Sequence, residues 1–219
     1  RNLVVNDSAA IAGRVVATSG SLAAAHPAST LPGDRATLEA NTSANPADSA
    51  NITLNASGAY ATTHSAVKNA NILTANGANA SIDLRYLSTV DSYVDHWGTN
   101  TRTISATSGG TIDLSGVTLI RGGSGTSGGL DRVRIVAETG GEIDLSSLMT
   151  VQGYTFFEAN AGGTLRFGDL AMTASTDIRA DGLGSRIAAA SLMLDPTAVV
   201  SVTDGAEIHL AGSLQNAMT

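Results

Sequence analysis

Hydrophobic and polar residues alternate with a period of two in short runs along this chain, which predicts β-strands. The clearest runs are Ile82-Asp-Leu, Ile112-Asp-Leu and Ile143-Asp-Leu, where one polar residue separates two aliphatic ones. The first aliphatic residue of each run serves as an anchor, and eight anchors recur along the sequence: Leu22, Ile52, Ile82, Ile112, Ile143, Leu165, Ile187 and Ile208. The steps between them are 30, 30, 30, 31, 22, 22 and 21 residues. A period of this size predicts a stack of similar supersecondary units.

Other apolar columns repeat in step with the anchors. One is a bend column, five residues after the anchor, formed by Leu87, Val117, Leu148, Leu170 and Leu192. Another is an aliphatic-x-small pair upstream of the corner, as in Ile104/Ala106, Ile135/Ala137, Phe157/Ala159, Ile178/Ala180 and Val200/Val202. Each unit therefore consists of a strand, a turn rich in Gly or Asx residues, a second strand, a bend and a third strand. No helix-length segment separates these strands, which excludes an alternating βαβ plan.

The pattern predicts an all-β fold, a single-stranded parallel β-helix (β-solenoid). Its coils have about 21–22 residues, with loop-enlarged coils of 30 residues in the N-terminal half. We expect one domain over residues 1–219: less regular coils in 1–50, where Pro27, Pro32 and Pro46 interrupt the pattern, enlarged coils in 51–142 and compact coils in 143–219. The last coil has no distinct polar cap, so we expect a fragment whose stack is continued by more chain or by a partner.

The enlarged coils place their additional residues near 23–37, 57–70, 91–103 and 121–132, after the third strand of the unit. Insertions at a fixed phase of a solenoid emerge on one face, and that face is often the binding face. The alternative is that they are tolerated surface loops, since lengthening a loop costs little free energy.

The most distinctive loop holds the only Trp of the chain, Trp97, beside Tyr93, Asp95 and His96. An aromatic face flanked by hydrogen-bonding groups suits a sugar ring, so these four residues are the candidate ligand-binding site. The alternative is that amphipathic Trp97 covers a hydrophobic flank of its coil.

A second candidate is the outward column of Asp83, Asp113 and Asp144, each placed between two inward aliphatic residues. Carboxylates one coil apart repel, and calcium would relieve that repulsion because hard cations prefer oxygen ligands. The favoured interpretation is a solvated ladder, because Arg166 continues the column and Ser115 and Ser146 offer local hydrogen bonds.

The composition of the chain argues against several classes of function. The net charge is −7 and basic residues form no run, so we expect no nucleic-acid partner. No stretch is long and apolar enough to predict a membrane span, and there is no Cys for thiol or Cys-metal chemistry. The four His residues are scattered without a triad or a metal-ligand spacing. We therefore expect no catalytic residues, no enzyme and no cofactor, with calcium the one candidate ion.

The register resembles the right-handed β-helix of bacterial surface and secreted proteins, such as filamentous-haemagglutinin-like adhesins and autotransporter passengers. The resemblance implies a structural or adhesive scaffold of a bacterial cell surface or extracellular matrix. Its lateral loops would contact glycans or neighbouring surface proteins, and its open ends would self-associate end to end into filaments. The alternative is a polysaccharide-processing enzyme, a lyase or hydrolase, or a phage-tailspike-like carbohydrate-binding β-helix.

Overall fold

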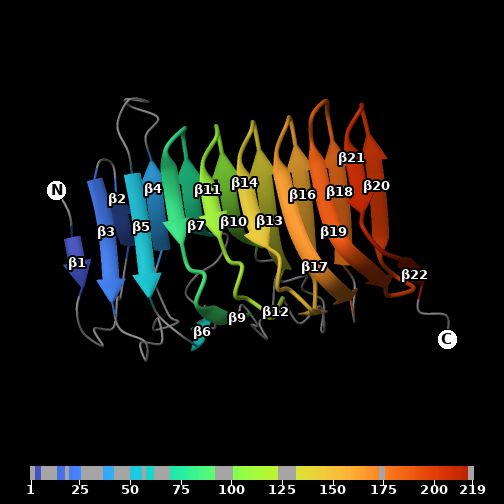
Figure 1. Cartoon of the computed structure of the whole chain (residues 1–219), viewed down its shortest axis with the longest axis horizontal. Helices are drawn as coiled ribbons and strands as arrows, with labels where there is room; N and C mark the ends of the chain where they lie inside the picture. The colour runs from blue at the N-terminus through green and yellow to red at the C-terminus, as the bar shows by residue number, and fades with distance from the viewer. Residues whose placement is uncertain are drawn as a thin grey trace.

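Parallel strands on three faces build the whole described part of the chain (Figure 1). A computed structural model describes residues 3–5, 14–17, 20–25, 37–41, 50–55, 58–61, 70–91, 101–122, 132–172 and 176–216, with side chains from Ile72 onward except those of Met172 and Asn216. These residues form strands, turns and bends and no helix, and every strand pair is parallel, as in β10 with β13 and β17 with β19. The all-β, parallel β-helix prediction is confirmed.

The described strands lie on three faces of the rod. Face 1 is the eight-stranded sheet of β2 (Arg14–Ala17), β4 (Thr37–Asn41), β7 (Ala70–Asn76), β10 (Thr101–Thr107), β13 (Arg132–Glu138), β16 (Thr155–Asn160), β18 (Thr176–Asp181) and β20 (Val199–Thr203). Face 2 carries the anchors and contains β1 (Leu3–Val5), β3 (Gly20–Ala25), β5 (Ala50–Asn55), β8 (Ala80–Asp83), β11 (Thr111–Asp113), β14 (Glu142–Leu145) and β21 (Glu207–Leu210). Face 3 contains β6 (Gly58–Ala61), β9 (Leu87–Asp91), β12 (Leu119–Arg121), β15 (Thr150–Gln152) and β22 (Leu214–Asn216). The long strands β17 (Thr164–Met172) and β19 (Arg186–Leu194) run through faces 2 and 3 and join them into one fourteen-stranded sheet.

The anchor register predicted from sequence is the register of the sheet. All eight anchors pair in one continuous ladder, from Leu22 opposite Ile52 to Ile187 opposite Ile208. The bend column from Leu87 to Leu192 is buried, and so are the small residues Ala106, Ala137 and Ala159 on face 1. Phe157 and Phe167 pack edge to face in this interior, with ring centroids 4.8 Å apart. The core is therefore a set of stacked columns of like residues.

The Gly-Gly corners use their two glycines differently. Gly140 has a φ of +76°, which L side chains rarely adopt, and Thr139 before it also has a positive φ of +52°. Gly141 has no such φ, but a Cβ there would lie 2.1 Å from the carbonyl oxygen of Ala106 in the coil below. The first glycine thus permits the turn, and the second permits two coils to approach closely.

The described strands of the N-terminal region extend the two sheets. Where residues 1–50 are described, their strands follow the common plan: β2 pairs with β4, and β1 pairs with β3 so that Leu3 extends the anchor ladder beyond Leu22.

Candidate functional site

The predicted aspartate column exists on face 2. Asp83, Asp113 and Asp144 are register partners on β8, β11 and β14, and Arg166 of β17 continues the column. All three carboxylates lie on the outer surface because the residues before and after each of them point into the core.

Arg85 neutralises the first two carboxylates of this column. Its Nε donates to Asp83 Oδ1 at 2.9 Å and its Nη2 donates to Asp83 Oδ2 at 2.7 Å, while Nη2 lies 3.4 Å from Asp113 Oδ2 in the next coil. The hydrogen bond and charge of Asp83, followed by the charge of Asp113, raise the pKa of the Arg85 guanidinium. The positive charge of Arg85 therefore relieves the repulsion between Asp83 and Asp113, which was the reason for considering calcium.

Asp113 and Asp144 also accept hydrogen bonds within the bend that follows each of them. Asp113 Oδ1 accepts a hydrogen bond from the backbone N–H of Ser115 at 2.9 Å, and Asp144 Oδ1 accepts one from Ser146 at 2.8 Å. The predicted local hydrogen bonds are confirmed, and the aspartates form Asx turns. Residues 70–91, 101–122, 132–172 and 176–216 contain no group of three or more His, Cys, Asp and Glu side chains that would hold a metal ion. The calcium hypothesis gains no support from these contacts.

The predicted loop site, with Tyr93, Asp95, His96 and Trp97, lies outside the described residues, and its role as a ligand site stays a prediction.

A polar hollow that the sequence analysis did not single out lies on the outer surface of face 1. Its volume is about 620 Å³, within the range of small-molecule sites. It is lined by residues of β13, β16, β18 and β20 and of the corners beside them: Glu138, Glu158, Asn160, Ala161, Arg179, Asp181, Gly182, Ser201 and Thr203. Most of these side chains stand in two outward columns, Glu158–Arg179–Ser201 and Glu138–Asn160–Asp181–Thr203.

Glu158 is the most tightly held carboxylate of this hollow. Arg134 of the neighbouring coil donates from Nε to Oε1 at 2.9 Å and from Nη2 to Oε2 at 2.6 Å. Burial by itself raises the pKa of Glu158, but the hydrogen bond and charge of Arg134, with smaller contributions from Asn160 and Arg179, hold the pKa below its ordinary value. The same hydrogen bond raises the pKa of Arg134. Glu158 is therefore an ionised hydrogen-bond acceptor, unsuited to act as a general acid at neutral pH.

Other polar groups of the hollow are also held by neighbours. Thr203 Oγ1 donates to Asp181 Oδ1 at 2.6 Å from the next coil, and Arg179 Nη2 donates to Asp177 Oδ2 at 2.9 Å. Along β18, the acceptors Asp177 and Asp181 thus lie on either side of the donor Arg179, and neighbouring groups hold all three in place. Such an array is suited to hydrogen-bonding a hydroxylated ligand.

The alternation of inward and outward residues on face 1 could have predicted the residues of this hollow. Each aliphatic-x-small pair defines an inward face, so the residues between and after its members must point outward. Applied to Phe157/Ala159 and Ile178/Ala180, that rule selects Glu158, Asn160, Arg179 and Asp181. These side chains lie side by side because Glu158 pairs in register with Arg179 and Asn160 with Asp181.

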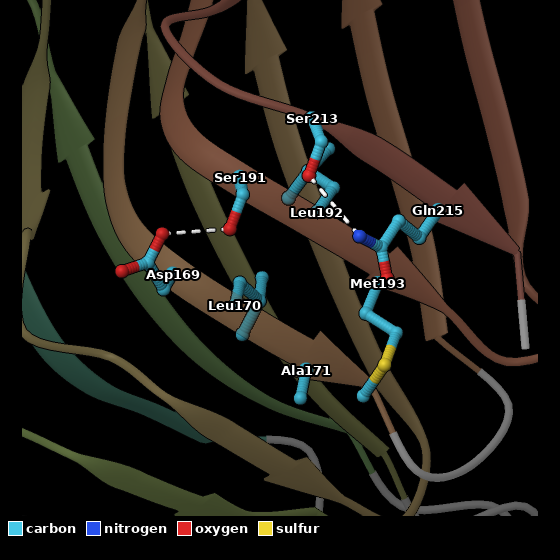
Figure 2. Close-up of a pocket in the computed structure, with 8 residues that line it drawn as sticks. All are labelled: Asp169, Leu170, Ala171, Ser191, Leu192, Met193, Ser213 and Gln215. Carbon is cyan, nitrogen blue, oxygen red and sulfur yellow. Dashed lines mark hydrogen bonds between the residues drawn. The ribbon is translucent and has the colours of Figure 1, made fainter.

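A smaller hollow of about 230 Å³ lies on face 3 near the C-terminal end (Figure 2). It is lined by Asp169, Leu170, Ala171, Ser191, Leu192, Met193, Ser213 and Gln215. Figure 2 shows Ser191 facing Asp169 across two coils, where its Oγ donates to Oδ1 at 2.6 Å. The volume is below that of typical small-molecule sites, and this polar pair connects neighbouring coils.

The chain was compared with known proteins, and no family model, curated protein or solved structure matches it. Among the residues that the structure describes, there is no helix with the length and apolar character needed to span a bilayer.

Proposed function

We propose that this protein is a non-enzymatic structural and adhesive scaffold at a bacterial cell surface or in an extracellular matrix. The observation that carries the proposal is the engagement of its outward carboxylates by neighbouring coils. Arg85 reaches Asp113, Arg134 binds Glu158, and Arg166 Nε donates to Glu142 at 2.6 Å. These pairs join one coil to the next along the rod.

Such pairing favours a scaffold over a polysaccharide-processing enzyme. Glycoside hydrolysis needs a carboxylic acid that is protonated near neutral pH and a second carboxylate placed opposite it. Among the described residues, the carboxyl groups with a shifted pKa are Glu158 and Asp195, and both pKa values are lowered, that of Glu158 against its burial and that of Asp195 by hydrogen bonds from Thr197. Both shifts favour the ionised form.

The polar hollow on face 1 supports glycan contact by the lateral surface. Sugar hydroxyls donate and accept hydrogen bonds, and the hollow offers carboxylates, one guanidinium, an amide and hydroxyls along four coils. Its carboxylates, from Glu138, Glu158 and Asp181, outnumber its single guanidinium, from Arg179. We therefore expect neutral glycans or amino sugars to bind in preference to polysaccharides rich in uronic acid.

The experiment is a glycan array with the whole chain, run beside turnover assays on neutral and acidic polysaccharides. Binding without turnover is the expected result. Asp181→Ala and Arg179→Ala should weaken binding if the hollow is the contact, and Trp97→Ala should do so if the predicted loop is. Asp195→Ala, which removes a partly exposed carboxylate outside both regions, is the matched control.

Turnover would overturn the scaffold proposal. Degradation of a polysaccharide that is abolished by Asp113→Ala, Asp144→Ala or Glu158→Gln would establish the alternative, an enzyme that uses the outward carboxylates. An array on which neither glycans nor surface proteins bind would remove the adhesive part of the proposal.

A further inference from the structure

The ion pairs at the polar hollow on face 1 do not involve two of its carboxylates. Arg134 binds Glu158 with two hydrogen bonds, and Arg179 is held by an aspartate of its own strand. These pairs do not neutralise Glu138 and Asp181, which also line the hollow and are exposed. The hollow therefore has a surplus of negative charge, which favours a ligand that carries positive charge.

Glu138 and Asp181 stand in one outward column, with Asn160 between them. The register pairs Glu138 with Asn160 and Asn160 with Asp181 in successive coils. Neighbouring strands of a sheet lie about 4.8 Å apart, so the backbone positions of the two carboxylates are about 9.6 Å apart along the rod. A ligand with two amines at this spacing can contact both carboxylates.

The lining residues give the hollow an elongated outline. They come from four successive coils, which contribute β13, β16, β18 and β20 side by side along the rod (Figure 1). Three steps between coils cover about 14 Å, whereas the two outward columns lie two residues apart along each strand, which is about 7 Å. An extended ligand fits this outline when its chain runs along the rod, across the strands.

The other groups of the lining are suited to sugar hydroxyls. Asn160 offers an amide, and Ser201 and Thr203 offer hydroxyls, so the lining contains both donors and acceptors. A basic peptide would bring its charges on long apolar stems, and the lining has only one apolar side chain, that of Ala161, to pack against them. These groups favour a hydroxylated cation over a basic peptide.

The position of Asp181 is fixed by its neighbours. Buried Ser185 donates from Oγ to the carbonyl oxygen of Asp181, and the same Oγ accepts a hydrogen bond at 2.9 Å from the backbone N–H of Gly162 in the preceding coil. Thr203 Oγ1 donates to Asp181 Oδ1 at 2.6 Å. Both the backbone and the carboxylate of Asp181 are therefore held in place before a ligand arrives, which lowers the entropic cost of binding.

The column of Glu138, Asn160 and Asp181 matches the repeat of one class of glycan. In a flat β-1,4-linked chain alternate sugars present the same edge, so the amines of the first and third sugars lie on one side. We propose that the hollow binds such a glycan with free amines, an oligomer of glucosamine, laid along the rod. Its first and third ammonium groups contact Glu138 and Asp181, and its middle sugar lies against Asn160. This inference rests on the proposed glycan contact of the same hollow and names the class of glycan.

The test is a calorimetric titration of the whole chain at mildly acidic pH, where sugar amines are protonated. The β-1,4-linked trimer of glucosamine should bind at least tenfold more tightly than the trimer of N-acetylglucosamine, which has no amine charge. The glucosamine dimer should bind at least fivefold more weakly than the trimer, because it lacks the sugar that reaches the second carboxylate. Trilysine, which has the charges without the hydroxyls, should bind at least tenfold more weakly than the glucosamine trimer.

Two conservative variants test the spacing of the carboxylates. Glu138→Gln and Asp181→Asn each remove one charge and keep an acceptor oxygen. Each should weaken binding of the glucosamine trimer at least fivefold and abolish its advantage over the dimer. Glu207→Gln removes the same charge from an exposed residue of face 2 and is the matched control, with unchanged binding expected. Circular dichroism checks that the three variants keep the fold.

Three results would overturn the inference, and they separate it from the proposed function. Equal binding of the free and acetylated trimers, lost in Arg179→Ala, would reject the requirement for amines and leave the proposed glycan contact standing. Trilysine that binds as tightly as the glucosamine trimer would show that charge alone is recognised. Absence of binding by any glycan, in the titration and on the array, would remove both the inference and the proposed glycan contact.

Discussion

Strands β18 and β20 are neighbours in one ladder and have the same inward pattern, yet only β18 is buried. Ile178 and Ala180 have a coil above and a coil below, whereas Val200 and Val202 have only the coil below. The residue type is apolar in both strands, so the second neighbour makes the difference. In a solenoid, each coil supplies part of the core of the next coil, and stability is close to a sum of such interfaces.

The largest expected effect contrasts a core residue with its counterpart in the last coil. Phe157 lies in the same face 1 column as Val200, is fully buried and packs edge to face on Phe167. Phe157→Ala should lower the free energy of unfolding by about 3–5 kcal/mol. Val200→Ala should lower it by about 1 kcal/mol or less, because much of this side chain is already exposed. Urea unfolding of both variants measures the difference, and equal losses would contradict the neighbour argument.

The corners give a contrast of intermediate size. Gly141→Ala places a Cβ against the carbonyl oxygen of Ala106 and should destabilise the protein by about 1–3 kcal/mol. The equivalent corner position of the last coil is already Ala206, where the corner beneath, containing Gly182, Leu183 and Gly184, is one residue longer. Ala206→Gly is the matched control and should change the free energy of unfolding by less than about 1 kcal/mol. Thermal melts that rank the two substitutions in the opposite order would show that close approach does not limit this corner.

The smallest expected effect concerns charge and depends on pH. The pKa of Glu158 is lower in the folded protein than in the unfolded chain, so the stabilisation is present above the ordinary Glu pKa of about 4.3 and is lost as the pH falls through the folded value. Glu158→Gln should therefore cost about 1 kcal/mol at pH 7 and close to nothing near pH 2.

Glu207→Gln in the last coil is the control for that measurement. Glu207 is exposed, and its replacement should stay within about 0.5 kcal/mol at either pH. A loss in Glu158→Gln that persists at pH 2 would assign the effect to packing and not to the ion pair with Arg134.

Local sequence was sufficient for much of the fold. Period-two alternation is a property of neighbouring residues, so the strands, their inward residues and the anchor ladder could be read from the sequence. The same reasoning placed the aspartates outward and gave Asp113 and Asp144 local partners in Ser115 and Ser146, because an Asx turn spans two residues. The contact between Arg85 and Asp113 was harder to predict, because Asp113 belongs to the next coil.

The sequence by itself determined the coil, through its anchors, its Gly-Gly corners and its columns of like residues. Only the tertiary structure decided the burial and the contacts that arise between stacked coils. It added Leu3 to the anchor ladder, gathered Glu158, Arg179 and Asp181 around one hollow, and left Val202 exposed at the end. The physical reason is that alternation fixes where a side chain points, whereas burial and charge pairing depend on a neighbour 20 to 30 residues away in the chain.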